Sequence, residues 1–290
     1  MINGDKNLGI LEKIFFFPQC ITNGWKGTVK NLLVKKVKLT SYEIIHGFGS
    51  PSRRLSNMFW DTVNWKNLSD KLIGGVKILD LGCGAGKYGL FFKKIIGENF
   101  SSYTGIDINR RDNLPKEFTF ITDKGENAFT YINDQNCITS QSALEHFEDD
   151  IEALSLVTKQ LILRGKPFIQ IHIVPASAGL FLWLWHGRRY YSKKNLGHIS
   201  KLLLKEYDVK SCVVPLGSVR CFISHLTLIT LLKKILSSFN KHIFGMDNIE
   251  KKIEELIKKS VIKERSVNES IPSMWALVIA SNHIEIDSVI

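Results

Sequence analysis

The sequence predicts a doubly wound α/β fold, in which helices cover both faces of a mostly parallel sheet. Residues 76–97 combine a short apolar run, a turn with three alternate glycines and a segment of helical periodicity. Further apolar runs then alternate with helical patterns as far as residue 175. The chain has 290 residues and is 44% hydrophobic and 23% charged, which suits a globular protein with a full core.

The first strand leads directly into the glycine turn. Residues 76–81 are almost continuously apolar, which predicts a strand that is buried on both faces. In the turn, residues 80–86, glycines let the backbone bend tightly and let a ligand approach without a Cβ in the way. Helical spacing follows in Tyr88, Phe91, Phe92 and Ile95. Strand, glycine turn and helix form the first half of a nucleotide-binding unit, in which the helix N-terminus offers free N–H groups.

The order of residues in the turn separates two kinds of nucleotide site. A dinucleotide-binding turn has a glycine three residues after its second one, and Lys87 occupies that position here. The chain has instead Asp80 two residues before the first of three alternate glycines. This pattern resembles motif I of the class I S-adenosylmethionine-dependent methyltransferases, whose loop curls round the methionine and ribose part of the cofactor. A nicotinamide-dependent oxidoreductase is therefore disfavoured.

The resemblance implies S-adenosylmethionine as cofactor and assigns its site to the loop and the next strands. The second strand, residues 103–107, ends about 20 residues beyond the glycines, the separation at which a carboxylate reaches ribose hydroxyls. In the family, an acidic residue after the third strand, here residues 118–123, commonly contacts the adenine amino group. The cofactor-binding residues implied are Asp80, Gly82, Cys83, Gly84, Ala85, Gly86, Asp107, Ile108, Asp123, Lys124, Gln141 and Ser142.

The rest of the chain completes the predicted architecture. Strands are expected at residues 137–142, 167–174, 209–214 and 274–280, and helices at 151–165 and 192–204. Family members insert their last strand antiparallel, so the resemblance implies a Rossmann-like, seven-stranded, mostly parallel sheet. Residues 1–70 are expected to form an N-terminal helical cap, with helices at 11–17 and 29–37, a turn at 47–51 and a helix ending near Leu72. Residues 71–290 form the methyltransferase domain, and a helical insertion at about 217–270 departs from the family.

The candidate catalytic residues are histidines. Leu144-Glu145-His146 follows the fourth strand, and such a trio is frequent in family members that act on small molecules. A hydroxyl acceptor needs a group that takes its proton, and His146 is the best candidate because it faces the site in this topology. His172 on the fifth strand and His186 are the runners-up, and Glu145 is expected to orient a helix start. Each of these histidines also has an ordinary interpretation as a hydrogen-bonded structural residue.

Two segments are expected to bind the substrate. Arg53 and Arg54 carry guanidinium groups that suit a carboxylate or phosphate, although they also fit exposed charges at a helix start. The apolar stretch at 177–191 contributes His186 and Tyr190. It is expected to be a lid over the substrate, a segment that lies against a lipid surface, or a hydrophobic helix packed onto the sheet.

The absence of motifs that other family members use limits the class of methyl acceptor. The fourth strand does not end in the Asn/Asp-Pro-Pro-Tyr/Phe motif of family members that methylate amide or adenine nitrogens. The sequence also lacks the Pro-Cys pair of members that attack a pyrimidine ring. It contains no cluster of acidic residues that would predict a metal site. O-methylation of a small molecule or glycan is therefore favoured, and the net charge of +11 would suit a nucleotide-linked or lipid-linked sugar. An RNA- or protein-modifying methyltransferase and a non-catalytic cofactor-binding module stay open, as does contact with nucleic acid.

The cysteines and the apolar segments indicate the cellular compartment in which the protein is expected. The five cysteines are odd in number and contain no C-x-x-C pair, which favours reduced thiols in the cytoplasm. No run of about 18 apolar residues predicts a transmembrane helix, and charges interrupt the apolar residues of the N-terminus, which argues against a signal peptide. Peripheral contact with a membrane remains open.

Overall fold

A computed structural model describes residues 1–25, 27, 32–40, 49–109, 114–232, 246–264 and 271–290. These residues form a seven-stranded sheet in the order β3-β2-β1-β4-β5-β7-β6. The strands are β1 Val76–Leu81, β2 Phe100–Asp107, β3 Thr119–Thr122, β4 Cys137–Gln141, β5 Ile169–Pro175, β6 Lys210–Leu216 and β7 Met274–Ala280. Strand β7 pairs antiparallel with β5 and β6, whereas β1 to β5 pair in parallel. The predicted Rossmann-like architecture is confirmed.

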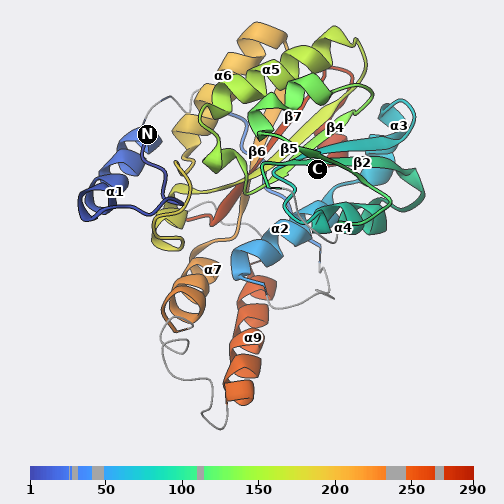
Figure 1. The fold of residues 1–290 in the computed structure, drawn as a ribbon. Coiled ribbons are helices and arrows are strands. Elements are labelled where there is room, and N and C mark those ends of the chain that lie inside the picture. The colour runs from blue at the N-terminus through green and yellow to red at the C-terminus, as the bar shows by residue number, and fades with distance from the viewer. Residues whose placement is uncertain (26, 28–31, 41–48, 110–113, 233–245, 265–270) are drawn as a thin grey trace.

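Helices cover both faces of this sheet (Figure 1). The α-helices are α1 Ile10–Trp25, α2 Pro51–Thr62, α3 Trp65–Lys71, α4 Lys87–Ile96, α5 Asp150–Leu163, α6 Lys193–Tyr207, α7 Val219–Ser224, α9 Met246–Lys263 and α10 Ile286–Val289. Shorter 3-10 helices are η1 Gly97–Asn99, η2 Gly125–Tyr131, η3 Leu144–His146 and η4 Ser177–Phe181, and η5 His225–Leu232 is a π-helix. Helices α5 and α6 lie on one face, and α2 and α4 lie on the other.

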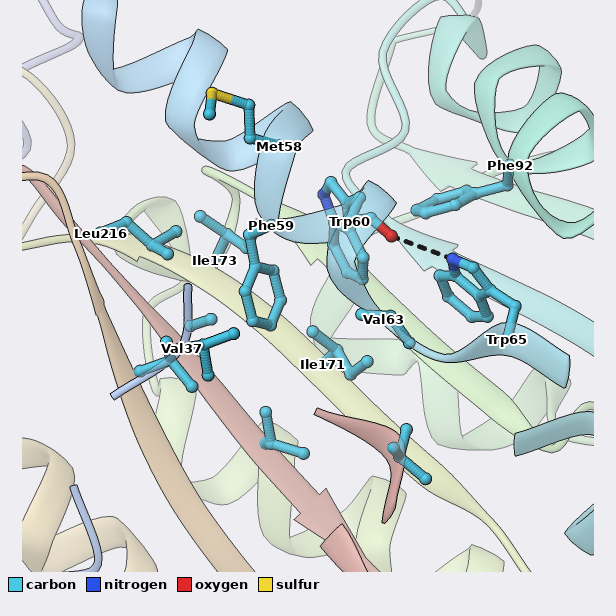
Figure 2. Packing of buried hydrophobic residues seen from close by; sticks show 14 of the residues in the cluster. Val37, Met58, Phe59, Trp60, Val63, Trp65, Phe92, Ile171, Ile173 and Leu216 are labelled. Carbon is cyan, nitrogen blue, oxygen red and sulfur yellow. Dashed lines mark hydrogen bonds between the residues drawn. The ribbon is translucent and has the colours of Figure 1, made fainter. Parts of the chain in front are cut away.

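Each face of the sheet has its own core because successive strand residues point to opposite sides. On β1, Ile78 belongs to the core under α2 and α4, and Leu79 belongs to the core under α5 and α6. Helix α2 adds aromatic side chains to the first core, where Trp60 packs edge-on against Phe92 at 5.0 Å (Figure 2). The indole of Trp65 donates a hydrogen bond to the carbonyl of Trp60 at 2.9 Å. The predicted cap therefore shares its core with the sheet, and a division near residue 70 stays a prediction.

The helix predicted at 29–37 is wrong for its described part, residues 32–37. This segment is extended and runs beside the edge strand β6, where Val34 forms a parallel bridge with Val213. The N–H of Lys35 donates to the Val213 carbonyl and the N–H of Val213 donates to the Leu33 carbonyl, both at 2.9 Å. Unpaired backbone groups on an edge strand attract such a segment and override a local helical pattern. Residues 29–31, and residues 47–48 of the predicted turn, lie outside the described residues.

The apolar stretch after β5 forms η4 and an irregular segment rather than one long helix. Leu180 and Tyr190 pack in a separate small core with Phe16 and Cys20 of α1. Among the described side chains, helix α1 exposes five large apolar ones, those of Ile10, Leu11, Ile14, Phe15 and Ile21. Within the described part of the chain, no helix has the length and apolar character needed to cross a membrane.

The insertion before β7 is helical in its described parts, as predicted. Helices α7 and α9 pair with each other and extend away from the sheet below α2 (Figure 1). Arg54 of α2 forms an ion pair with Glu254 of α9. Glu264 accepts hydrogen bonds from the N–H groups of Ser218 and Cys221, both at 2.9 Å. The ion pair of Arg54 with Glu254 attaches the insertion to α2, and the hydrogen bonds of Glu264 hold the two ends of the insertion together.

Candidate active site

The turn after β1 has the conformation that its three glycines predict. Gly82, Gly84 and Gly86 have φ angles of 70°, 55° and 68°, a region that residues with a Cβ rarely adopt. A Cβ on Gly82 would lie 2.5 Å from the Cβ of Ala143, and one on Gly86 would lie 2.5 Å from the ring of Phe120. A Cβ on Gly84 would meet no atom within 4 Å. Packing therefore requires Gly82 and Gly86, whereas the space beside Gly84 is free for a ligand.

Asp107, the last residue of β2, supports this turn from the neighbouring strand. Its Oδ2 accepts a hydrogen bond from the N–H of Gly84 at 2.9 Å, and its Oδ1 accepts one from the N–H of Asn109 at 2.9 Å. The carboxylate lines a cavity of about 300 Å³ together with Cys83 and Gly84. Each carboxylate oxygen can accept a further hydrogen bond, so Asp107 retains acceptor capacity toward this cavity.

Asp80 lies beneath the turn rather than in the lining of the cavities around it. Its side chain is buried, with Oδ2 accepting from the hydroxyl of Tyr103 at 2.6 Å and Oδ1 accepting from that of Thr139 at 3.0 Å. Burial raises the pKa of Asp80 to about 6, although the two hydrogen bonds oppose the shift. Asp80 thus links β1 to both of its neighbouring strands under the glycines.

A larger cavity of about 720 Å³ lies on the other side of the turn. It is lined by Arg53, Asn57, Gly82, Cys83, Gly84, Ala85, Lys87, Tyr88, Leu90, Phe91, Lys94 and Gln141. Arg53 donates a hydrogen bond from Nη1 to the hydroxyl of Tyr88 at 3.0 Å and lies over the Tyr88 ring at 5.6 Å. That hydroxyl in turn donates to Asn57 at 2.8 Å. Helix α2 therefore holds a cationic group across the cavity from the glycine turn.

Gln141, at the end of β4, has an unsatisfied donor at this cavity. Its Oε1 accepts a hydrogen bond from the indole N–H of Trp60 at 3.0 Å. Its Nε2 is buried and has no hydrogen-bond partner among the described residues. Leaving a buried amide group unpaired costs about 1–3 kcal/mol, so a bound ligand with an oxygen acceptor would remove that cost. The side-chain amide of Gln141 is therefore the clearest unpaired hydrogen-bond donor of this site.

A smaller cavity of about 100 Å³, most of whose lining residues are polar, adjoins the larger one, with which it shares Arg53 and Gln141. Its other lining residues are Ser50, Ser52, Ser56, Ser142, Glu145, Pro175, Trp183, His186 and Met274. Glu145 is 1% exposed, and its Oε2 has no hydrogen-bond partner among the described residues. Burial raises the pKa of this carboxyl group. The sequence predicts only a helix-orienting role for Glu145, whereas the structure includes it in the lining of this cavity.

His146 lies next to Glu145 and interacts with a residue that the sequence analysis missed. Its Nδ1 is 2.6 Å from Oδ2 of Asp5, and its Nε2 is 3.9 Å from Oε1 of Glu145. The Nδ1 of His186 is 3.0 Å from Oδ1 of Asp5, and the two imidazole rings meet edge-on at 4.7 Å. Burial opposes protonation of His146, but Asp5 and Glu145 outweigh it and raise its pKa. No local pattern identifies Asp5, because it lies 141 residues before His146.

Asp123 and Lys124, which were predicted to bind the cofactor, make hydrogen bonds within the protein. Asp123 is half-buried, and its carboxylate accepts hydrogen bonds from the Tyr131 hydroxyl at 2.7 Å and the Asn127 amide at 2.9 Å, which lower its pKa. The N–H of Lys124 also donates to this carboxylate at 2.7 Å. Ile108 is 65% exposed directly after Asp107. None of these residues lines the cavities described above, and their adenine contacts stay predictions.

Three further predicted residues are buried and line none of the three cavities described above. His172 is fully buried within β5, with Nδ1 2.9 Å from Oγ of Ser140, and burial lowers its pKa to about 3. Arg54 is occupied by its ion pair with α9, and Tyr190 donates its hydroxyl hydrogen bond to the carbonyl of Trp183. These positions lend no support to a catalytic role for His172 or to substrate contacts for Arg54 and Tyr190.

Comparisons with known proteins identify the fold and no more. No protein-family model and no curated protein sequence matches the chain. The plantazolicin methyltransferase BamL, whose crystal structure contains a triazolic desmethylPZN analog and SAH, is 15% identical to this chain, and the two structures have a TM-score of 0.53. The similarity covers 80% of this chain and 86% of BamL. A SAM-dependent methyltransferase from Archaeoglobus fulgidus is 16% identical, with 80% and 95% covered and a TM-score of 0.44.

Proposed function

We propose that this protein is an S-adenosylmethionine-dependent methyltransferase. The open space beside Gly84 is the observation that carries the proposal, because this glycine has a φ angle of 55° and no atom of the described residues would lie within 4 Å of a Cβ there. The fold shared with BamL and the position of Asp107 beside the same glycine support it. A third support is the unpaired amide nitrogen of Gln141.

The residues around the glycine turn fit this cofactor. The carboxylate of Asp107 would accept hydrogen bonds from ribose hydroxyls, as the resemblance predicts. The guanidinium of Arg53 and the amide of Gln141 face the same cavity and would bind the carboxylate of the methionine part. When bound, S-adenosylmethionine supplies a methyl group that its sulfonium centre already activates. The protein therefore has to position an acceptor and remove its proton.

The acceptor that we favour is a hydroxyl group of a small molecule or glycan. The smaller cavity is lined by serine hydroxyls, Glu145 and His186, which suit hydrogen bonding to a polar group. At about 100 Å³ it holds a fragment of a substrate rather than a whole one, so the remainder would occupy the larger cavity beside Arg53. The unpaired Oε2 of Glu145 is placed to accept the hydroxyl proton, and His146, predicted as the base, lies directly behind Glu145.

Titration calorimetry tests the cofactor assignment. We expect S-adenosylhomocysteine to bind with a micromolar dissociation constant, and NAD to give no signal under the same conditions. Tighter binding of the dinucleotide would contradict the proposal, because it would assign the glycine turn to the other kind of nucleotide site.

A labelling experiment tests the acceptor. Cell extract is incubated with the protein and radiolabelled S-adenosylmethionine, and then separated into small-molecule, lipid, glycan, RNA and protein fractions. We expect label in a small-molecule, lipid or glycan fraction. Label in RNA or protein alone would favour a macromolecule-modifying enzyme, and tight cofactor binding without any label would favour a non-catalytic module.

A further inference from the structure

Three side chains from distant parts of the chain bring metal-binding atoms together beside the smaller cavity. They are Asp5 near the N-terminus, His146 after β4 and His186 after η4. One oxygen and two imidazole nitrogens, one atom from each residue, all lie within 4.8 Å of one another. Imidazole and carboxylate together form a common ligand set for divalent transition metals.

The backbone holds this cluster in place. The N–H of Gly4 donates a hydrogen bond to the carbonyl of Gly187 at 2.6 Å, and the N–H of Gly187 donates to Oδ1 of Asp5 at 3.1 Å. A Cβ on Gly4 would overlap the backbone of Trp185, so the two segments approach more closely than another residue would permit. The N-terminal segment is therefore attached to the turn that carries His186. A ligand set held in this way loses little conformational freedom when it binds an ion.

Carboxyl groups at the cluster supply oxygen ligands. The two oxygens of Asp5 contact the Nδ1 atoms of His146 and His186, and Oδ1 also accepts the hydrogen bond from the N–H of Gly187. Glu145 adds a second carboxyl group, whose Oε2 is buried and unpaired among the described residues. The guanidinium of Arg188 is close, but it binds Glu148 at 3.0 Å and the carbonyl of His146 at 3.2 Å.

We propose that Asp5, His146 and His186 bind a divalent transition-metal ion, with Glu145 beside it. Three protein ligands leave a coordination position open, as in metal sites that act on a substrate. His186 also lines the smaller cavity, so the open position would serve an oxygen atom of the acceptor. This last role rests on the proposed methyltransferase function, whereas binding of the ion does not. An ion there would help to orient the acceptor hydroxyl and lower its pKa.

Metal binding is measured directly on untagged protein that has been treated with a chelator and dialysed. Zn²⁺ is titrated by calorimetry, and Co²⁺ is used as a second probe because its visible absorption reports the ligands. We expect one Zn²⁺ per chain, with affinity reduced about 100-fold or more in Asp5→Asn and in His186→Gln, since even residues outside the ligand shell change affinity by about 10–100-fold. His283→Gln is the matched control, because His283 is exposed and lies outside the cluster.

Thermal unfolding of each variant shows whether it is folded at the titration temperature, and only folded variants are compared. Failure of the wild-type protein to bind Zn²⁺ or Co²⁺ saturably would overturn the proposal. Unchanged affinity in both Asp5→Asn and His186→Gln would overturn it as well, and so would an equal loss in His283→Gln. Titration with S-adenosylhomocysteine is run separately, so a failure of the methyltransferase proposal is distinguishable from a failure of the metal site.

Discussion

Replacing Gly84 by alanine separates a ligand contact from a folding requirement. Gly84 and Gly165 both have positive φ angles, of 55° and 60°, and at both positions a new Cβ would meet no atom of the described residues within 4 Å. Either alanine should therefore cost about 1–2 kcal/mol, the strain of an L-residue at a positive φ angle. Gly165 follows α5, whereas Gly84 lines both cavities beside the turn. Gly165→Ala is thus a control for backbone strain outside the lining of these cavities.

Only Gly84→Ala should weaken cofactor binding. A methyl group that intrudes on a well-packed contact costs about 1–3 kcal/mol, which corresponds to a dissociation constant for S-adenosylhomocysteine raised about 5- to 150-fold. Calorimetry measures that constant, and thermal unfolding measures the strain as a fall in Tm of about 2–8 °C in both variants. Wild-type affinity in Gly84→Ala would refute the assignment of this space to the cofactor. Equal losses of affinity in both variants would show that strain, rather than contact, is responsible.

Four more substitutions test neighbouring features. Arg54→Ala should destabilise the fold by about 3–5 kcal/mol in urea unfolding, because it breaks a buried ion pair, and should leave affinity for S-adenosylhomocysteine unchanged. Arg53→Ala should instead weaken the affinity for S-adenosylhomocysteine and leave the free energy of unfolding nearly unchanged. Identical results for the two variants would contradict the assignment of Arg53 to the cofactor and of Arg54 to the ion pair. His172 has a folded pKa of about 3 against about 6.5 when unfolded, so the unfolded chain gains the proton first and stability falls as the pH drops below 6.5. Between pH 7.5 and 5, wild type should lose about 2 kcal/mol more than His172→Gln, and equal losses would argue against a buried neutral imidazole. Glu145→Gln should lower methyl transfer by about 10²–10⁴-fold without changing cofactor affinity, whereas full activity would exclude Glu145 as the proton acceptor.

The sequence by itself determined the sheet and the glycine turn. The last strand was predicted at residues 274–280, which are the residues of β7, and the fourth strand was correct to within one residue. The last strand is a short apolar run bounded by polar or turn residues, so the pattern that predicts it depends only on neighbouring positions. The three glycines and Asp107 were found in the same way, because spacing along the chain fixes their places on adjacent parallel strands.

Only the tertiary structure decided what surrounds that turn. Arg53 and Arg54 are equivalent in sequence terms, but successive residues of a helix point about 100° apart, so one lines the cavities and the other binds α9. The extended path of residues 32–37 depends on hydrogen bonds to β6, which no local pattern encodes. The same holds for the contact of Asp5 with His146 across 141 residues. Such contacts depend on how distant segments pack, and spacing along the chain carries no information about that packing.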